Sequence, residues 1–215
     1  MHLSASFSAA VELLGSVLAG EGCSACQRPL LIRAIFCSEC AASIEHAPFD
    51  GRKHIAPFVY GGAIADAIVA FKYDERPELA RPLSHLIKRG LPRLGDFAPD
   101  VVIPVPLHPT RLAERGFNQA ALLARPVATA LDSRFCPLAL SRTRDTPRQA
   151  QLERATRLNN VVGAFSVRTP KLVQGSRVLL VDDVRTTGAT LDACAEVLTQ
   201  SGAEEVRTLV IARTE

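Results

Sequence analysis

Two adjacent carboxylates, Asp182 and Asp183, separate an apolar run from small hydroxyl-bearing residues in VLLVDDVRTTGAT, residues 178–190. The apolar run predicts a buried strand, and the residues after the acids suit the start of a helix. The N–H groups and positive dipole of a helix N-terminus favour a phosphate, and Gly188 permits its close approach. The acids would repel phosphate, but they can bind vicinal hydroxyls or a divalent cation. A sugar phosphate satisfies both halves of the motif.

Two simpler interpretations of this stretch compete with a sugar-phosphate site. A strand that ends in paired acids is also typical of a Walker B element, but the partner motif requires a Gly-Lys dipeptide, and the chain contains none. The threonines could serve only as helix caps, but capping leaves the adjacent acids unexplained. We therefore favour the sugar-phosphate interpretation.

Four cysteines form a second constellation. Cys23 and Cys26 are separated by two residues, as are Cys37 and Cys40, and ten residues lie between the pairs. Two such knuckles can bring four thiolates around one ion, and zinc takes four soft sulfur ligands in a tetrahedron. In a reducing compartment this pattern favours a metal over disulfides. It predicts a structural zinc ribbon over residues 21–50.

The alternatives to a zinc ribbon are two disulfides in a secreted domain, or CxxC pairs that occur by chance. His46 and His54 follow the knuckles, and either could replace a thiolate, although plain surface positions are the simpler interpretation. Cys136 and Cys194 lie in apolar stretches of the sequence and are expected in the core.

The whole chain has the composition of an ordinary folded protein. Of its 215 residues, 47% are hydrophobic and 22% charged, and the formal net charge of +3 is too small to indicate a general polyanion binder. Residues 1–20 lack the basic n-region of a signal peptide, and Glu12 interrupts their apolar stretch, so we expect an N-terminal helix there. No later run reaches the roughly 18 apolar residues of a membrane span, and we expect a cytoplasmic protein.

Beyond a polar, proline-containing boundary near residue 50, strand-like and helix-like segments alternate. This order predicts an α/β domain over residues 51–215, with a parallel sheet flanked by helices. The predicted strands cover residues 55–60, 101–105, 161–167, 177–182 and 206–212, and the predicted helices cover residues 63–71, 78–89, 117–131 and 189–201. Ligands of such sheets gather at the carboxyl ends of the strands, which is where Asp182 and Asp183 lie.

Taken together, the motifs resemble the ComF family, a bacterial branch of the type I phosphoribosyltransferases linked to DNA uptake in natural competence. The resemblance extends from Cys23 onward. It is carried by the four cysteines, by FKY at 71–73, by PVPLHPTRLAERGFNQA at 104–120, by RTRDTPRQAQLERATRLNNVVGAF at 142–165 and by VLLVDDVRTTGAT at 178–190. It implies a type I phosphoribosyltransferase-like parallel sheet flanked by helices, preceded by a small zinc ribbon.

By this resemblance, the ligand would be 5-phosphoribosyl-1-diphosphate with magnesium. The ribose hydroxyls would lie on Asp182 and Asp183, and the 5-phosphate on the backbone of the loop that follows them. Lys72, Arg111 and Arg115 would stabilise the departing diphosphate, although each could instead be a solvated surface charge. The substrate-binding residues implied in this way are Asp182, Asp183, Arg185, Thr186, Thr187, Gly188, Ala189 and Thr190.

The segment between residues 134 and 157 contains six arginines and only two acids. The overlapping stretch from Arg142 to Asn160 is basic and has little apolar periodicity. This composition predicts either a mobile loop that closes over the ligand or a solvated connection. The proline-rich loop PVPLHPTR, which follows the strand at 101–105, occupies the position of the diphosphate loop that the family resemblance implies.

Two classes of function stay open at this stage. An enzyme would transfer the phosphoribosyl group to a nitrogen acceptor, which the sequence does not identify. A binding module would use the same fold to contact single-stranded DNA or proteins of the competence machinery, with Arg142, Arg144 and Arg148 as candidate phosphate contacts. Against strong DNA binding, only Phe117 and Phe135 offer aromatic side chains near the basic segments.

Overall fold

The computed structural model describes residues 22–30, 34–49, 51, 53–74, 76–144 and 163–215. The helix predicted for residues 1–20 lies outside these ranges, as does most of the loop predicted to begin at Arg142. Within the described ranges, no helix combines the length and the apolar character needed to span a bilayer.

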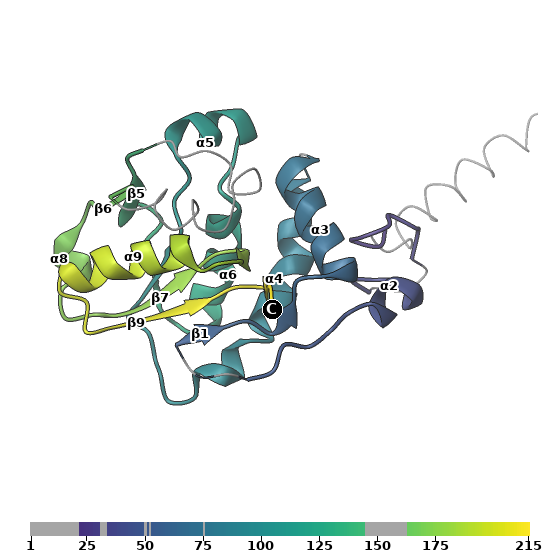
Figure 1. Ribbon diagram of the computed structural model, residues 1–215, viewed down its shortest axis with the longest axis horizontal. Coiled ribbons are helices and arrows are strands. Elements are labelled where there is room, and N and C mark those ends of the chain that lie inside the picture. The colour runs from purple at the N-terminus through teal and green to yellow at the C-terminus, as the bar shows by residue number, and fades with distance from the viewer. Residues whose placement is uncertain (1–21, 31–33, 50, 52, 75, 145–162) are drawn as a thin grey trace, which may run out of the picture.

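A five-stranded parallel sheet forms the centre of the structure (Figure 1). In spatial order its strands are β1 (His54–Ile55), β9 (Glu205–Leu209), β7 (Arg177–Val181), β3 (Val101–Pro104) and β4 (Arg134–Phe135). The central strand β7 pairs with β9 on one side and with β3 on the other. Four of its five residues are buried, as expected for a parallel sheet covered on both faces. The predicted α/β architecture is therefore confirmed.

Helices pack on both faces of this sheet. On one face lie α3 (Gly62–Tyr73), α4 (Ala80–Lys88, preceded by the 3-10 turn Pro77–Leu79) and α6 (Gln119–Ala130), and on the other lies α9 (Ala189–Gln200). Alternate residues of β7 enter the two cores: Leu179 and Val181 face α3, α4 and α6, whereas Val178 and Leu180 face α9. This alternation is the two-residue period of a strand buried on both sides. Cys194 lies in the second core, as expected, and so does Cys136.

A short second sheet continues the first beyond its carboxyl edge. Its parallel strands, in the order β2–β10–β8, are β2 (Phe58–Val59), β10 (Ala212–Arg213) and β8 (Val184–Arg185). The single strands predicted over 55–60 and 206–212 are wrong in this respect, because each is divided between the two sheets. Pro57 interrupts the first, since it has no N–H to donate. The second is buried along most of its length, so its apolar pattern does not mark the division.

The segment after β3 is not the loop that its proline-rich sequence predicts, because it contains the helix α5 (Pro109–Arg115). The Nδ1 atom of His108 accepts a hydrogen bond from the N–H of Thr110 at 3.4 Å and caps this helix. Pro109 stands in its first turn, and Gly116 ends it with a φ of 77°. These are ordinary helix start and stop signals, which a proline-rich sequence obscured.

The loop predicted to begin at Arg142 also begins later than expected. Arg142 ends β5 (Leu140–Arg142), which forms an antiparallel pair with β6 (Phe165–Val167). The side chain of Arg142 is buried, and its guanidinium lies 5.4 Å from the ring centroid of Phe165. The alternation of side chains along β5 turns this arginine inward, and the basic residues around it gave no sign of a strand in the sequence.

The remaining short elements are α8 (Pro170–Val173) and a 3-10 turn at Leu91–Leu94.

The four-cysteine unit, by which we mean the described residues between 22 and 49, contains the short helix α2 (Ser38–Ala42) and lies beside α3 (Figure 1). It is not separated from the rest by a solvent layer, because Cys23, Phe36 and Cys37 belong to the same hydrophobic core as α3. Any movement of the unit therefore affects how α3 is packed.

Candidate functional site

A cleft of about 490 Å³ lies at the carboxyl ends of β3 and β7. Side chains from α3, from α5 and from the N-terminal end of α9 form its walls. The predicted ligand-binding and catalytic residues among its lining are Lys72, Arg111, Arg115, Asp182, Asp183, Arg185, Thr186, Gly188, Ala189 and Thr190. Thr187 is not among the lining residues, and its Oγ1 accepts a hydrogen bond from the N–H of Ala189 at 3.4 Å.

Backbone hydrogen bonds of the sheet hold the acid pair in place. The N–H of Asp182 donates to the carbonyl of Leu209 at 3.1 Å, and the carbonyl of Asp183 accepts from the N–H of Ile211 at 2.9 Å. Oδ1 of Asp182 also accepts a hydrogen bond from the N–H of Asp183, at 2.9 Å. The two carboxylates are thus presented by a rigid strand end and not by a freely moving loop.

The loop after the acids leads directly into the N-terminus of α9. Gly188 occupies the N-cap position with a φ of 86°, a conformation that L side chains rarely adopt. A Cβ at this position would lie 3.0 Å from Nε of Arg185 and 3.1 Å from Oδ2 of Asp192. Residues 188–191 line the cleft, so the first turn of this twelve-residue helix meets it with N–H groups that have no partner within the helix. This end of the cleft is suited to a phosphate.

Lys72, in the last turn of α3, reaches the acid pair from the opposite wall. Its Nζ lies 2.8 Å from Oδ1 of Asp183, and the two side chains are 23% and 8% exposed. Burial would lower the pKa of Lys72, but the charges of Asp183 and Asp182 outweigh burial and raise it. Burial, reinforced by the charge of Asp183, raises the pKa of Asp182 to about 7. Lys72 thus neutralises one acid, whereas ionisation of the other opposes folding.

Asp182→Asn is therefore expected to stabilise the protein above pH 7. The pKa of Asp182 is about 7 in the folded protein, against an ordinary value of 3.8, so its carboxyl opposes folding increasingly as the pH rises from 3.8 to about 7. We expect a gain of about 1–3 kcal/mol in the free energy of unfolding at pH 8 and a smaller gain at pH 5. Urea titrations at the two pH values measure the difference.

Asp183→Asn is the matched control for this prediction. It makes the same change one residue later, but it leaves the ammonium of Lys72 opposite a neutral group. We expect it to lower the free energy of unfolding by about 1–3 kcal/mol. If Asp182→Asn were also destabilising at pH 8, the carboxyl of Asp182 would not carry the ionisation cost inferred here.

The wall formed by α5 supplies two further cations, Arg111 and Arg115, one helical turn apart. Nη1 of Arg115 donates a hydrogen bond to Oε1 of Gln119 at 2.7 Å. Its guanidinium also lies 5.4 Å from the ring centroid of Tyr73, which comes from α3. Arg115 therefore connects the α5 wall with the α3 wall.

Several other side chains line the cleft although they are not among the predicted sugar-phosphate ligands, among them Tyr60, Asn118 and Arg142. Oδ1 of Asn118 accepts from the N–H of Ala120 at 3.0 Å, and its Nδ2 donates to the carbonyl of Val105 at 3.1 Å. Asn118 thus caps α6 and ties it to the end of β3. An Asn before an apolar helix is a recognisable capping signal, whereas Arg142 is brought to the cleft by the β5–β6 pairing alone.

The four predicted zinc ligands lie together in the four-cysteine unit, with all sulfur atoms within 4.8 Å of one another. Sγ of Cys26 and Sγ of Cys37 are 3.8 Å apart. This distance is far longer than the roughly 2.0 Å of a disulfide. It fits the edge of a tetrahedron with zinc–sulfur bonds of about 2.3 Å. The donor set could therefore hold a metal ion such as zinc.

Backbone N–H groups favour the thiolate form of Cys23. Burial would raise the pKa of Cys23, but backbone hydrogen bonds, including one from the N–H of Cys37 at 3.4 Å, lower it to about 6.

Neither His46 nor His54 takes part in the cysteine cluster that the described residues form. The ring of His46 packs on Phe58, and Nδ1 of His54 lies 3.1 Å from Oγ1 of Thr208.

Curated relatives match nearly the whole chain. The DNA utilization protein YhgH of Escherichia coli O6:H1 is 32% identical over 206 residues, which cover 89% of this chain and 90% of the relative. Competence protein F of Haemophilus influenzae is 30% identical over 206 residues, with the same coverage of the two chains. The chain belongs to the ComF family.

Residues 118–215 of this ComF-family chain match the phosphoribosyl transferase domain. The match confirms the predicted phosphoribosyltransferase-like fold, and the cysteine cluster is consistent with the small zinc ribbon expected before it. The matched residues include the acid pair and the loop up to Thr190, but not Lys72 or the arginines of α5. Among solved structures, the glutamine phosphoribosylpyrophosphate amidotransferase from B. subtilis, complexed with ADP and GMP, covers 65% of this chain and 30% of its own. It is 24% identical, with a TM-score of 0.44.

Proposed function

We propose that this ComF-family protein binds 5-phosphoribosyl-1-diphosphate together with Mg²⁺ in the cleft. The observation that carries the proposal is the convergence of three features on one cavity: an acid pair, a helix N-terminus preceded by a glycine of positive φ, and a group of cationic side chains that includes Lys72, Arg111 and Arg115. A ligand with a diol, a phosphate and a diphosphate is complementary to these three features in that order. The phosphoribosyl transferase domain match supports the same ligand class.

Each part of the ligand has a counterpart in the cleft. The 5-phosphate would lie against the backbone of residues 186–190 at the start of α9, and the ribose hydroxyls would donate hydrogen bonds to Asp182 and Asp183. Arg111 and Arg115 would bind the diphosphate. Carboxylate oxygens are suitable ligands for Mg²⁺, which would supply charge neutralisation at the diphosphate when bound.

The chemistry that this arrangement supports is phosphoribosyl transfer to a nitrogen acceptor. The nitrogen lone pair forms a bond to the anomeric carbon while the bond from that carbon to the diphosphate breaks, and the diphosphate leaves with the electron pair. Negative charge then grows on the leaving group, where Arg111 and Arg115 stabilise it. Lys72 neutralises Asp183, the second of the two acids that would bind the ribose hydroxyls. The proton displaced from the acceptor nitrogen passes to solvent.

Calorimetry followed by an assay of diphosphate release tests this function. We expect the diphosphate sugar to bind in a Mg²⁺-dependent manner, and we expect one member of a panel of nitrogen bases to cause diphosphate release. Binding without release for any base would make the protein a binding module on a phosphoribosyltransferase scaffold. Absence of binding with Mg²⁺ present would overturn the proposed ligand.

We also propose that the four-cysteine unit holds one Zn²⁺ with a structural role. All four ligands come from the protein, which leaves no open position for a reacting molecule, as is typical of structural zinc sites. The short spacing between the sulfur atoms supports this proposal.

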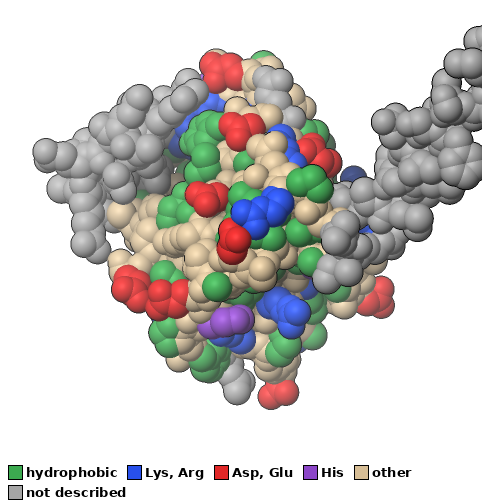
Figure 2. Space-filling view, turned by 90° about the vertical axis from the view of Figure 1, so that its right-hand side faces the viewer, with side chains coloured by type: hydrophobic (Ala, Val, Ile, Leu, Met, Phe, Trp, Pro, Cys, Tyr) green, Lys and Arg blue, Asp and Glu red, His purple; other side chains and the backbone are tan. Residues whose placement is uncertain are grey.

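Contact with single-stranded DNA during DNA uptake is a second candidate function. It is supported by the names of two relatives, DNA utilization protein YhgH and competence protein F. On the face shown in Figure 2, the basic side chains are interspersed with acidic and hydrophobic ones and do not form a continuous positive surface. Arg144, which follows β5, is exposed and remains a candidate, and Arg148, which the sequence also suggests, lies outside the described residues.

Replacing Arg144 and Arg148 with alanine is expected to flatten the salt dependence of DNA binding. Removal of each arginine that binds a phosphate should reduce the log–log slope for a single strand by about 0.7. Arg142 is left in place because it is buried in β5. Fluorescence anisotropy with labelled single strands at several salt concentrations measures the slope.

The matched control replaces Arg81 and Arg89, two exposed arginines at the ends of α4, which changes the net charge equally. This variant should keep the wild-type slope. Equal slopes for all three proteins would place the DNA contact elsewhere or assign it to a partner protein.

A further inference from the structure

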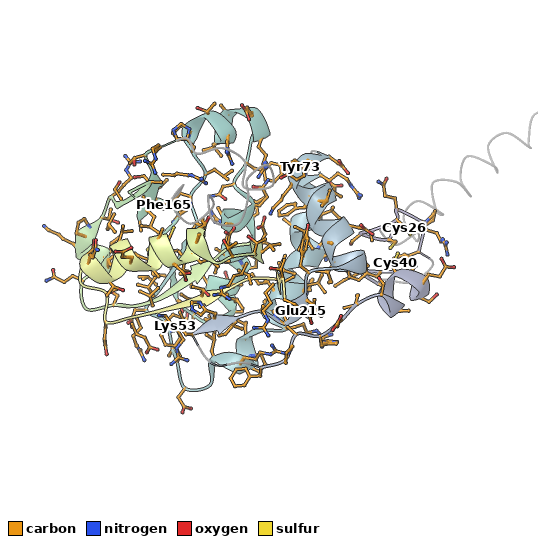
Figure 3. All side chains as sticks on the ribbon, viewed as in Figure 1. Cys26, Cys40, Lys53, Tyr73, Phe165 and Glu215 are labelled. Carbon is orange, nitrogen blue, oxygen red and sulfur yellow. The ribbon has the colours of Figure 1, made fainter. Side chains whose placement is uncertain are left out.

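Helix α3 connects the four-cysteine unit with the cleft. Figure 3 shows Cys26 and Cys40 beside one end of this helix and Tyr73 at the other end. A helix of twelve residues is about 18 Å long and moves largely as a rigid rod. Whatever fixes its first turn therefore also influences where its last turn lies.

The first turn of α3 is capped by a side chain from the four-cysteine unit. The residue at the N-cap position is Gly61, which has no side chain to offer. In its place, Oγ of Ser43 accepts a hydrogen bond from the N–H of Ala63 at 2.9 Å. The same hydroxyl donates to the carbonyl of Cys40 at 2.8 Å. Ser43 thus links a predicted zinc ligand to the start of the helix.

Gly62 shows how closely the unit approaches α3. Its φ is 47°, and a Cβ at this position would lie 2.5 Å from the carbonyl oxygen of Ser43 and 2.6 Å from its Oγ. Backbone and side chain of Ser43 would both have to move to admit even a methyl group. The contact between the two segments is therefore specific in shape as well as in hydrogen bonding.

The last turn of α3 carries the two side chains that reach across the cleft. Lys72 lies 2.8 Å from Asp183, and the ring of Tyr73 lies 5.4 Å from the guanidinium of Arg115. Both interactions depend on the position and tilt of α3, because Asp183 follows β7 and Arg115 belongs to α5. A charge-assisted hydrogen bond weakens steeply when its donor is displaced by an ångström.

We propose that Ser43 is a positioning residue for the ligand cleft. It fixes the start of α3, and through this helix it places the ammonium of Lys72 on Asp183. The four-cysteine unit then contributes to sugar-phosphate binding although none of its residues lines the cleft. The expected effect of Ser43 on ligand affinity rests on the proposed sugar-phosphate site, whereas its expected effect on the position of Lys72 does not.

Ser43→Ala is expected to weaken the binding of ribose 5-phosphate with Mg²⁺ about three- to fivefold, the factor that corresponds to the loss of one helix cap. All four cysteines are retained, so the zinc content should be unchanged. Ser43→Thr keeps a hydroxyl and should restore most of the affinity. Ser38→Ala, the same change elsewhere in the unit, is the control and should bind like the wild type.

A double-mutant cycle with Lys72→Met separates positioning from general destabilisation. If Ser43 acts through Lys72, then Ser43→Ala should cause no further loss of affinity in the Lys72→Met background. An equal loss in both backgrounds would overturn the proposal. Gly62→Ala disturbs the same contact from the helix side and should reproduce the behaviour of Ser43→Ala in both backgrounds. If Ser43→Ala fails to fold, the cycle is carried out with Gly62→Ala.

Acylation of Lys72 by an amine-reactive ester, followed by mass spectrometry, tests the proposal without any cleft ligand. An ammonium held on Asp183 reacts slowly, so Ser43→Ala should accelerate labelling of Lys72 about three- to fivefold while leaving the exposed Lys171 unchanged. An unaltered rate at Lys72 would refute the positioning role. If wild-type protein does not bind ribose 5-phosphate, the proposed ligand fails, and the labelling result still decides the role of Ser43.

Discussion

The paired substitution of Asp182 and Asp183 by Asn is expected to weaken the binding of ribose 5-phosphate with Mg²⁺ at least about tenfold. Asn keeps the size of the side chain but removes its charge, so the hydrogen bonds from the ribose hydroxyls lose their charge assistance and Mg²⁺ loses its carboxylate ligands. Inorganic phosphate should bind with unchanged or slightly higher affinity, because the backbone of residues 186–190 remains and two negative charges are removed. Calorimetry with the two ligands measures this difference in selectivity.

Gly188→Val is expected to remove the other half of the site: the binding of inorganic phosphate should be lost, while the acid pair still binds hydroxyls and Mg²⁺. The acids remain, but a branched side chain at a φ of 86° and against Arg185 and Asp192 should distort the loop and remove the phosphate contribution. The control is Gly175→Val, because Gly175 has a similar φ of 69°, a Cβ there would have no neighbouring atom within 4 Å, and the residue does not line the cleft. Wild-type affinity and Mg²⁺ dependence in the paired Asn variant would show that the motif is a structural cap and not a ribose site.

Cys37→Ser is expected to abolish zinc binding and to unfold the four-cysteine unit while the main sheet survives. Wild-type protein purified without chelators should contain about one zinc ion per chain, and the variant close to none. The unit has few buried side chains of its own, so its stability depends on the metal. Amide exchange in the described residues between 22 and 49 should rise at least about tenfold, whereas exchange in β7 should change little. Elemental analysis and hydrogen exchange provide the two measurements.

Cys136→Ser makes the same substitution at a buried cysteine outside the cluster and serves as the control. It should lower stability through the second core but retain zinc. The loss of zinc should also increase exchange in the first turn of α3, because Ser43 is placed by Cys40. Zinc-free wild-type protein with a fully protected four-cysteine unit would contradict the assignment.

The sequence is most informative where a site is built from neighbouring residues. The acid pair, Gly188 and the start of α9 are contiguous, so strand, loop and helix can be recognised together from VLLVDDVRTTGAT. The cysteines occur as two close pairs, which limits the ways in which they can meet. In both cases the geometry depends mainly on local backbone conformation, and such short-range preferences are visible in residue types and spacing.

Pairing between distant segments is predicted less well. The apolar run at 206–212 gives no indication that it is divided between β9 and β10. Its apolar residues would be buried whether they formed one strand or two, so the apolar pattern is the same in both cases. Arg142 stands among basic, polar residues that are typical of a loop, yet β6 pairs with its strand and turns its side chain inward. Helix α5 escapes prediction because Pro109 at its start is equally typical of an irregular loop.

By itself, the sequence determined the α/β class, the set of four cysteines that could hold a metal and the loop suited to phosphate. Only the tertiary structure decided that Lys72 lies on Asp183, that Arg115 meets Tyr73 and that Ser43 caps α3. Each of these contacts joins segments from different elements. Their meeting depends on strand register and helix packing, which arise from the sum of many weak apolar contacts throughout the two cores and leave no local signature in the residues that finally touch.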